Sequence, residues 1–158
     1  MRKILILLGA VAIFVVGCGG SSSSTPVKLS GSTTNKGTKD LSGTSIDVQQ
    51  ADFAFTPSFI KGGTPGATIT VHVKNAGQNP HTFTSAALGV DEQVSPGESK
   101  DITVTLPQSG ASEFHCRFHQ QSNGMQGAFF FKDGDTVAGA GAGATSSSSD
   151  NGGYQYPN

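Results

Sequence analysis

Four residues in the second half of the chain have the types and spacing of a metal site. Cys116 and His119 are separated by two residues, and Met125 follows after a further five. His81 lies 35 residues before the cysteine, in the sequence Asn-Pro-His-Thr. Thiolate and thioether are soft donors suited to Cu(I), while imidazole suits both oxidation states of copper. The set could therefore hold copper through a redox cycle.

The N-terminus has the features of an export signal. Arg2 and Lys3 precede an apolar run over residues 4–16, which is too short for a comfortable membrane span. The run ends in Val-Val-Gly followed by Cys18, which resembles the lipobox of bacterial lipoproteins. We therefore expect residues 1–17 to be a cleaved signal peptide and Cys18 to be lipidated. An uncleaved anchor helix is the alternative. Both interpretations place the chain at a membrane, on its periplasmic or extracellular face.

The cysteine count supports a metal site around Cys116. Cys18 and Cys116 are the two cysteines of the chain, so lipidation of the first leaves no partner for a disulfide. A lone thiol in an oxidising compartment is prone to oxidation or cross-linking unless it is protected. Metal ligation would protect Cys116, and burial as a small inert side chain is the alternative. Met125 is likewise the one methionine left after removal of the signal peptide.

Composition divides the mature chain into three parts. Residues 18–43 are rich in Gly, Ser and Thr and are predicted to form a flexible tether behind the lipidated cysteine. Residues 135–158 are equally poor in large apolar side chains and are predicted to be a low-complexity tail. Residues 44–134 form the single predicted domain between them. The net charge is −1 and no basic stripe exists, so nucleic acid is not an expected partner. We also expect the chain to be a monomer.

Apolar residues in the predicted domain recur with period two, which is typical of strands that bury one face. Gly- and Pro-rich turns separate these runs, and no segment shows a convincing helical stripe. The pattern predicts an all-β fold, a β-sandwich of Greek-key type. The alternating runs are Ile46 and Val48; Ile69, Val71 and Val73; and Ile102, Val104 and Leu106.

The predicted strands would bring the four candidate ligands to one end of this sandwich. A strand ending at Cys116 places its sulfur there, and the loop over residues 117–124 turns back to present His119 and Met125. A strand over residues 126–132 follows. His81 begins another strand after a Pro turn and supplies the second imidazole from a neighbouring position.

The domain resembles the cupredoxins, the family of plastocyanin, azurin and amicyanin. The resemblance is carried by the strand and first histidine over residues 71–82, the Pro-Gly-Glu turn within 94–99, and the ligand segments 114–119 and 124–127. It implies one type 1 copper ion bound by four residues and one-electron transfer with soluble or membrane-bound redox proteins. The implied ligands are His81, Cys116, His119 and Met125, with the edge of His119 as the implied exit for the electron.

Two positions depart from the family pattern. Plastocyanin-like and amicyanin-like loops place four or two residues between the second histidine and the methionine, whereas five separate His119 from Met125. Gln120, Gln121 or a backbone carbonyl could therefore take the axial place. Phe118 stands where the family often has proline, and its N–H could point at the cysteine sulfur.

The remaining histidines and the other functional classes are weaker candidates. By alternation His72 should face solvent, and His115 should face away from the copper, where it could lie on an electron path to the surface. No nucleophile elbow is present, so we expect no enzyme activity. Zinc is disfavoured by a methionine ligand. The alternatives to an electron carrier are a copper-delivery lipoprotein and a metal-free adhesive or sensory β-sandwich.

Overall fold

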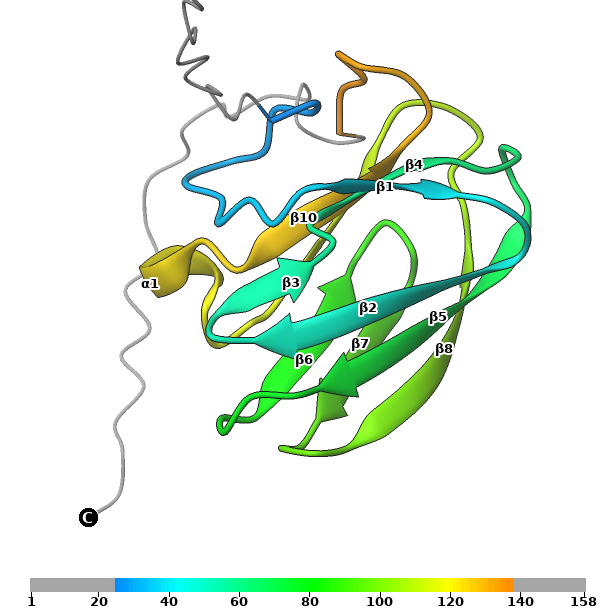
Figure 1. The fold of residues 1–158 in the computed structure, drawn as a ribbon. Coiled ribbons are helices and arrows are strands. Elements are labelled where there is room, and N and C mark those ends of the chain that lie inside the picture. The colour runs from blue at the N-terminus through cyan, green and yellow to red at the C-terminus, as the bar shows by residue number, and fades with distance from the viewer. Residues whose placement is uncertain (1–24, 138–158) are drawn as a thin grey trace, which may run out of the picture.

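The computed structural model describes residues 25–137, which form two facing β-sheets with one short helix (Figure 1). The predicted signal peptide, Cys18 and the tail beyond residue 137 lie outside the described residues. No helix within 25–137 is long and apolar enough to cross a membrane.

The larger sheet has six strands and carries most of the candidate site. Its spatial order is β1 (Thr38–Leu41), β4 (Phe59–Gly62), β10 (Gln126–Phe130), β9 (Ser112–His115), β6 (His81–Ser85) and β7 (Val90–Val94). The pairs β1–β4 and β4–β10 are parallel, and the remaining pairs are antiparallel.

The smaller sheet has four strands, in the order β3 (Ala54–Thr56), β2 (Ser45–Ala51), β5 (Thr68–Asn75) and β8 (Ser99–Thr105). Here β2 and β5 are parallel and the other pairs antiparallel. In β5 every second residue, Ile69, Val71 and Val73, is buried. The period-two pattern therefore predicted correctly which faces meet, and the all-β sandwich is confirmed.

The main core lies between the sheets and is built from the inward residues of both. Phe55, Phe83 and Phe114 stack or meet edge to face at its centre, with ring centroids 4.9 to 6.0 Å apart. Cys116 and Met125 belong to the same buried cluster, so the candidate site is continuous with the core. Each such buried aromatic side chain removes about 150 to 250 Å² from water, which makes it a large contributor to the stability of the domain.

The folded domain is longer than residues 44–134 at both ends. The expected tether contributes β1 and the buried Val27, and the expected tail is joined to the fold by bridges from Lys28 to Thr136 and from Ala111 to Val137. Val27, Leu29 and Val137 from these additions pack beside Ala128 and Phe130 of β10. A second buried cluster forms there from Val27, Phe59, Ala111, Ala128 and Phe130.

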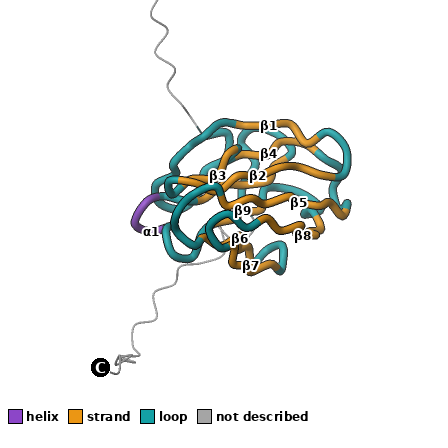
Figure 2. The backbone as a smooth tube through the Cα atoms, turned by 60° about the horizontal axis from the view of Figure 1, so that its bottom comes forward, coloured by secondary structure: helices purple, strands orange, loops and turns teal. Residues whose placement is uncertain are grey.

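The helix α1 (Gln120–Asn123) is a single turn that the sequence did not predict. It lies at one end of the sandwich, in the loop between β9 and β10 (Figure 2). Gly124 ends it in the left-handed conformation, with φ of 64°, and its N–H donates to the carbonyl of Gln120 at 2.9 Å. Glycine at this position is the usual way to end a helix, because it has no Cβ to clash.

Candidate metal centre

Cys116 directly follows β9 and is completely buried. Its backbone N–H donates to the carbonyl of Met125 at 3.0 Å, which closes the base of the loop 116–125. Its Sγ lies 3.4 Å from the backbone nitrogen of Thr82. In the described residues it is therefore Thr82, rather than Phe118, whose N–H points at the sulfur.

His81 is the first residue of β6 and is 1% exposed. It pairs with Val94 of β7. The side-chain amide of Asn75, at the end of β5, donates to the carbonyls of Asn79 and Val94 at 2.8 and 2.9 Å. These bonds hold the Pro turn against the neighbouring strand. The backbone of His81, and with it the origin of the imidazole, is therefore positioned by the sheet rather than by a free loop.

His119 is positioned by the turn that follows the cysteine. The N–H groups of His119 and Gln120 both donate to the carbonyl of Cys116, at 3.1 and 2.9 Å. The N–H of Met125 in turn donates to the carbonyl of His119 at 3.2 Å. Of the three residues His81, Cys116 and His119, only His119 is partly exposed.

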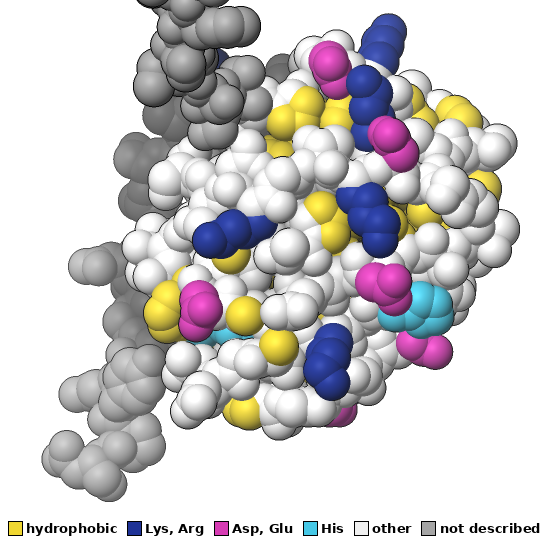
Figure 3. All heavy atoms as spheres, in the orientation of Figure 1, with side chains coloured by type: hydrophobic (Ala, Val, Ile, Leu, Met, Phe, Trp, Pro, Cys, Tyr) yellow, Lys and Arg dark blue, Asp and Glu magenta, His cyan; other side chains and the backbone are white. Residues whose placement is uncertain are grey.

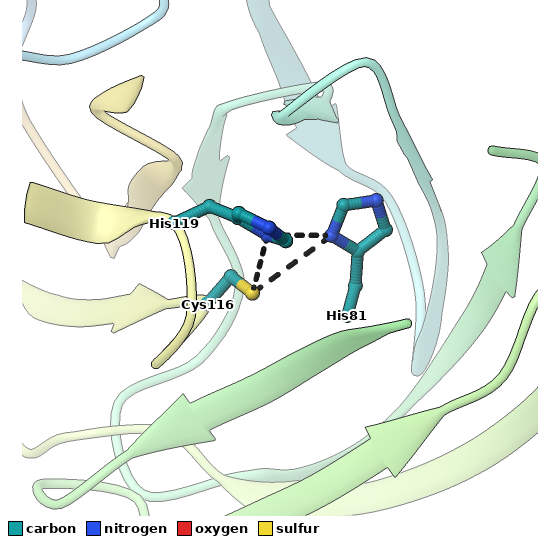
Figure 4. Close-up of side chains that lie close together, drawn as sticks. All are labelled: His81, Cys116 and His119. Atoms are coloured by element: carbon teal, nitrogen blue, oxygen red, sulfur yellow. Dashed lines mark hydrogen bonds between the residues drawn. The ribbon is translucent and has the colours of Figure 1, made fainter. Parts of the chain in front are cut away.

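The three predicted equatorial ligands converge on one point (Figure 4). Nδ1 of His81 lies 3.2 Å from Nδ1 of His119, and the sulfur of Cys116 lies 3.8 and 3.4 Å from these two nitrogens. A point equidistant from the three atoms is about 2.0 Å from each, and nitrogen and sulfur ligands bind zinc at roughly 2.0 to 2.3 Å. A first-row transition metal ion therefore fits between them with little movement.

Burial favours the neutral form of both imidazoles. Burial lowers the pKa of His81, and the nearby His119 lowers it further, whereas the charge of Asp52 raises it. Burial also lowers the pKa of His119. Metal ligation requires an unprotonated ring nitrogen, so both shifts favour metal binding at neutral pH.

Met125 is completely buried and lies beside the cysteine in the main core. The extra residue before it is accommodated by α1, because a helical turn shortens the span of the loop. Gln121 is exposed, and the Gln120 amide donates to Glu113 at 2.6 Å and to Gln126 at 3.0 Å. These contacts favour Met125 over the two glutamines, and its axial role stays a prediction.

An N-terminal strap, residues 30–34, crosses the loop that carries these ligands. Thr34 donates from its N–H to the carbonyl of Gly124 at 2.8 Å and from its hydroxyl to that of Asn123 at 2.7 Å. The buried Gln126 amide donates to three acceptors of the strap. They are the carbonyls of Ser30 and Ser32, both at 2.8 Å, and the hydroxyl of Thr33 at 3.1 Å.

Phe53 is a further residue of the site, one that the sequence pattern did not indicate. Its ring centroid lies 4.6 Å from that of His119 and 6.2 Å from that of His81. It comes from the turn between β2 and β3, on the opposite sheet from the ligands. No local sequence pattern reports such a contact, since the chain positions are far apart.

The other two histidines lie where alternation placed them. His72 is on the outer face of β5, with Nδ1 2.6 Å from the carboxylate of Asp101. His115 precedes the cysteine and lies 3.3 Å from the carboxylate of Glu113. Neither belongs to the group of converging donor atoms.

Comparison with known proteins identifies the family. A family model described as the cupredoxin-like domain matches residues 21–129. The chain therefore belongs to the cupredoxin-like family, as the ligand motifs indicated. Among curated protein sequences no match is found.

Solved structures with the same fold include several copper proteins. The metal-binding domain of a Cu(I)-exporting P-type ATPase from Streptococcus pneumoniae is 18% identical, with 65% of this chain and 98% of that chain covered and a TM-score of 0.50. A dithionite-reduced auracyanin from Roseiflexus castenholzii is 20% identical, with 61% and 98% covered and a TM-score of 0.48. At these identities the similarity shows the fold alone.

Proposed function

We propose that this chain is a type 1 copper protein that carries single electrons, with His81, Cys116 and His119 as equatorial ligands and Met125 as the axial one. The observation that carries the proposal is the convergence of two imidazole nitrogens and one thiol within 3.8 Å of one another. Two histidines, a cysteine and a weak axial methionine are the donor set of blue-copper sites.

The geometry favours electron transfer over copper delivery. His81 and Cys116 are buried, and the loop bearing His119 is held by backbone hydrogen bonds and by the strap. Copper bound in such a site would supply the redox couple, while the chain keeps the donor positions unchanged. A delivery protein needs an exchangeable ion, and a closed, braced site exchanges its ion slowly. The same reasoning gives no support to an enzymatic role.

The proposed route for the electron is the partly exposed edge of His119. Phe118 beside it is 46% exposed, with ring centroids 6.1 Å apart, and would provide apolar contact for a redox partner. Charged side chains of both signs are interspersed on the face shown in Figure 3, and no patch of a single sign is seen on it. Redox partners meet through small, weak interfaces, so a brief apolar contact suffices. His115 is the alternative route.

The N-terminal features support an exported, membrane-tethered protein. Lipidation at Cys18 would confine the monomeric domain to the periplasmic or extracellular face of a membrane. Confinement raises the effective concentration of the carrier near membrane-bound donors and acceptors.

The test is Cu(II) titration of the purified mature chain. We expect an intense thiolate-to-copper absorption at about 600 nm and a paramagnetic-resonance spectrum of type 1 copper. The bound copper should also show reversible voltammetry. Cys116→Ser should abolish the band, and His72→Gln, which changes a histidine outside the site, should retain it. A band that survives in Cys116→Ser would refute the ligand assignment. Transfer of copper to an apo acceptor without reversible voltammetry would favour delivery.

A further inference from the structure

The turn that carries Phe53 has an unusual backbone conformation. Asp52 and Phe53 form the two-residue connection between the antiparallel strands β2 and β3, and both have positive φ, 48° and 59°. Such hairpin turns favour Asn-Gly or Asp-Gly, because residues with a Cβ are strained in the left-handed region. The aspartate is a common choice at the first position, and a phenylalanine at the second is not.

The strained residue Phe53 packs against the metal centre. The Phe53 ring contacts the His119 imidazole, with an interplanar angle of 56°, and meets His81 edge to face at 84°. The two imidazoles are themselves 5.0 Å apart. The three rings therefore form one packed group, and the partly exposed Phe53 is part of its outer wall.

The end of β2 holds the turn in place. The completely buried Gln50 crosses between the sheets, and its amide donates to the carbonyl of Thr82 at 3.1 Å. Its backbone carbonyl accepts from the N–H of Ala76 at 2.9 Å. Gly77 packs between the end of β2 and His81, and a Cβ at this glycine would lie 3.4 Å from both Ala51 Cα and His81 Nε2. The strand that enters the turn is thus fixed by these contacts, and a strained conformation persists where the surrounding structure holds it.

We propose that Phe53 is a positioning residue of the metal centre. Its ring fixes the orientation of the two imidazoles and closes the centre to small ligands from solvent. Strained backbone collects at functional sites, and a smaller residue would suit this turn better if the turn only had to connect two strands. The proposal rests on the proposed copper function, because it concerns the same ligands.

The first test uses the metal-free mature chain and needs no copper. Asparagine tolerates the left-handed conformation, whereas leucine keeps the apolar bulk and the strain. We expect metal-free Phe53→Asn to unfold at the same temperature as Phe53→Leu or at a higher one. If Phe53→Asn unfolds at a lower temperature than Phe53→Leu, the turn carries no strain that asparagine relieves, and the proposal loses its premise and fails.

The second test measures access to bound copper, with azide as the probe. In the wild-type protein, azide should leave the absorption and paramagnetic-resonance spectra unchanged. In Phe53→Asn it should change both. Copper loss to a chelator should be at least about tenfold faster, in line with the roughly tenfold to hundredfold loss of metal affinity when a residue that supports a metal ligand is removed. Phe131→Asn, at a partly buried phenylalanine remote from the ligands, is the matched control and should behave as wild type.

The outcomes separate the two proposals. A wild-type chain that binds no copper overturns the proposed function, whatever Phe53 does. A wild-type chain that binds copper, with Phe53→Asn matching it in azide response and in copper loss, overturns the role of Phe53 alone.

Discussion

Thr82 is hydrogen-bonded to Cys116 and to the residue that follows it, across two neighbouring strands. The N–H of Thr82 points at the Cys116 sulfur at 3.4 Å, and the Thr82 hydroxyl accepts from the N–H of Arg117 at 2.9 Å. Thr82 also directly follows His81. One residue therefore ties the histidine on β6 to the cysteine after β9, and the spacing of two ligands depends on it.

Thr82→Val tests this link. The substitution removes the acceptor for the Arg117 N–H, so we expect a loss of about 1 to 3 kcal/mol in the free energy of unfolding. Urea unfolding of the metal-free chain measures it. Thr103→Val, on the outer side of β8, is the control and should change the value little. Equal effects of the two substitutions would contradict a special role for Thr82.

Gly124→Ala should disrupt the loop that carries His119 and Met125. The new Cβ would lie 2.8 Å from the backbone oxygen of Ser32, and the backbone is left-handed. Gly89→Ala is a matched control, because its φ of 65° is nearly the same and no atom lies within 4 Å of its Cβ. Both variants should lose about 1 to 2 kcal/mol from backbone strain, and Gly124→Ala should lose more. Thermal unfolding compares them.

Gln126→Leu should loosen the strap. The buried amide makes four side-chain hydrogen bonds, three of them to the strap and one accepted from Gln120. Their loss leaves several polar groups unpaired, and we expect a destabilisation of about 1 to 3 kcal/mol or more. Hydrogen exchange should accelerate at Thr34 and Gly124 before it does in β5. Gln121→Leu, an exposed position, should leave exchange unchanged; equal acceleration in both variants would argue against the strap.

The His72–Asp101 pair should give a pH-dependent contribution to stability far from the metal. The hydrogen bond with Asp101 raises the pKa of His72, and the charges of Asp101 and Asp47 add to the rise. A raised pKa in the folded state stabilises the fold below the unfolded pKa of about 6.5, and the gain is lost as pH rises through the folded pKa. Asp101→Asn should therefore lower the melting temperature at about pH 5.5 and leave it unchanged at about pH 9. A difference that persists at the higher pH would exclude this linkage.

Copper should stabilise the folded chain through the same ligands. An ion that binds only the folded state adds about 2.7 kcal/mol at a free concentration one hundred times its Kd. We expect a higher unfolding temperature with copper for the wild-type chain, and no such rise for Cys116→Ser. Calorimetry of each protein with and without the ion measures the difference. A rise in Cys116→Ser would indicate binding elsewhere.

The sequence predicted the sandwich and the three converging ligands for different physical reasons. Alternating apolar residues report which face of a strand is buried, and His81, Cys116 and His119 are scarce residue types whose spacing is itself informative. The strand β1 and the strap were missed because they are held by hydrogen bonds, which polar segments form without a hydrophobic pattern. Phe53 was not identified from the sequence because its contact with His119 depends on a turn in the facing sheet.

Val27 has a mechanical consequence for a chain anchored at its N-terminus. Tension along the tether would reach Val27 before it reaches the strap, and Val27 is buried among Phe59, Ala128 and Phe130. That cluster must be pulled apart before load passes to the hydrogen bonds between Thr34 and Gly124. If Cys18 is lipidated as proposed, this arrangement would isolate the ligand loop from tension on the membrane anchor.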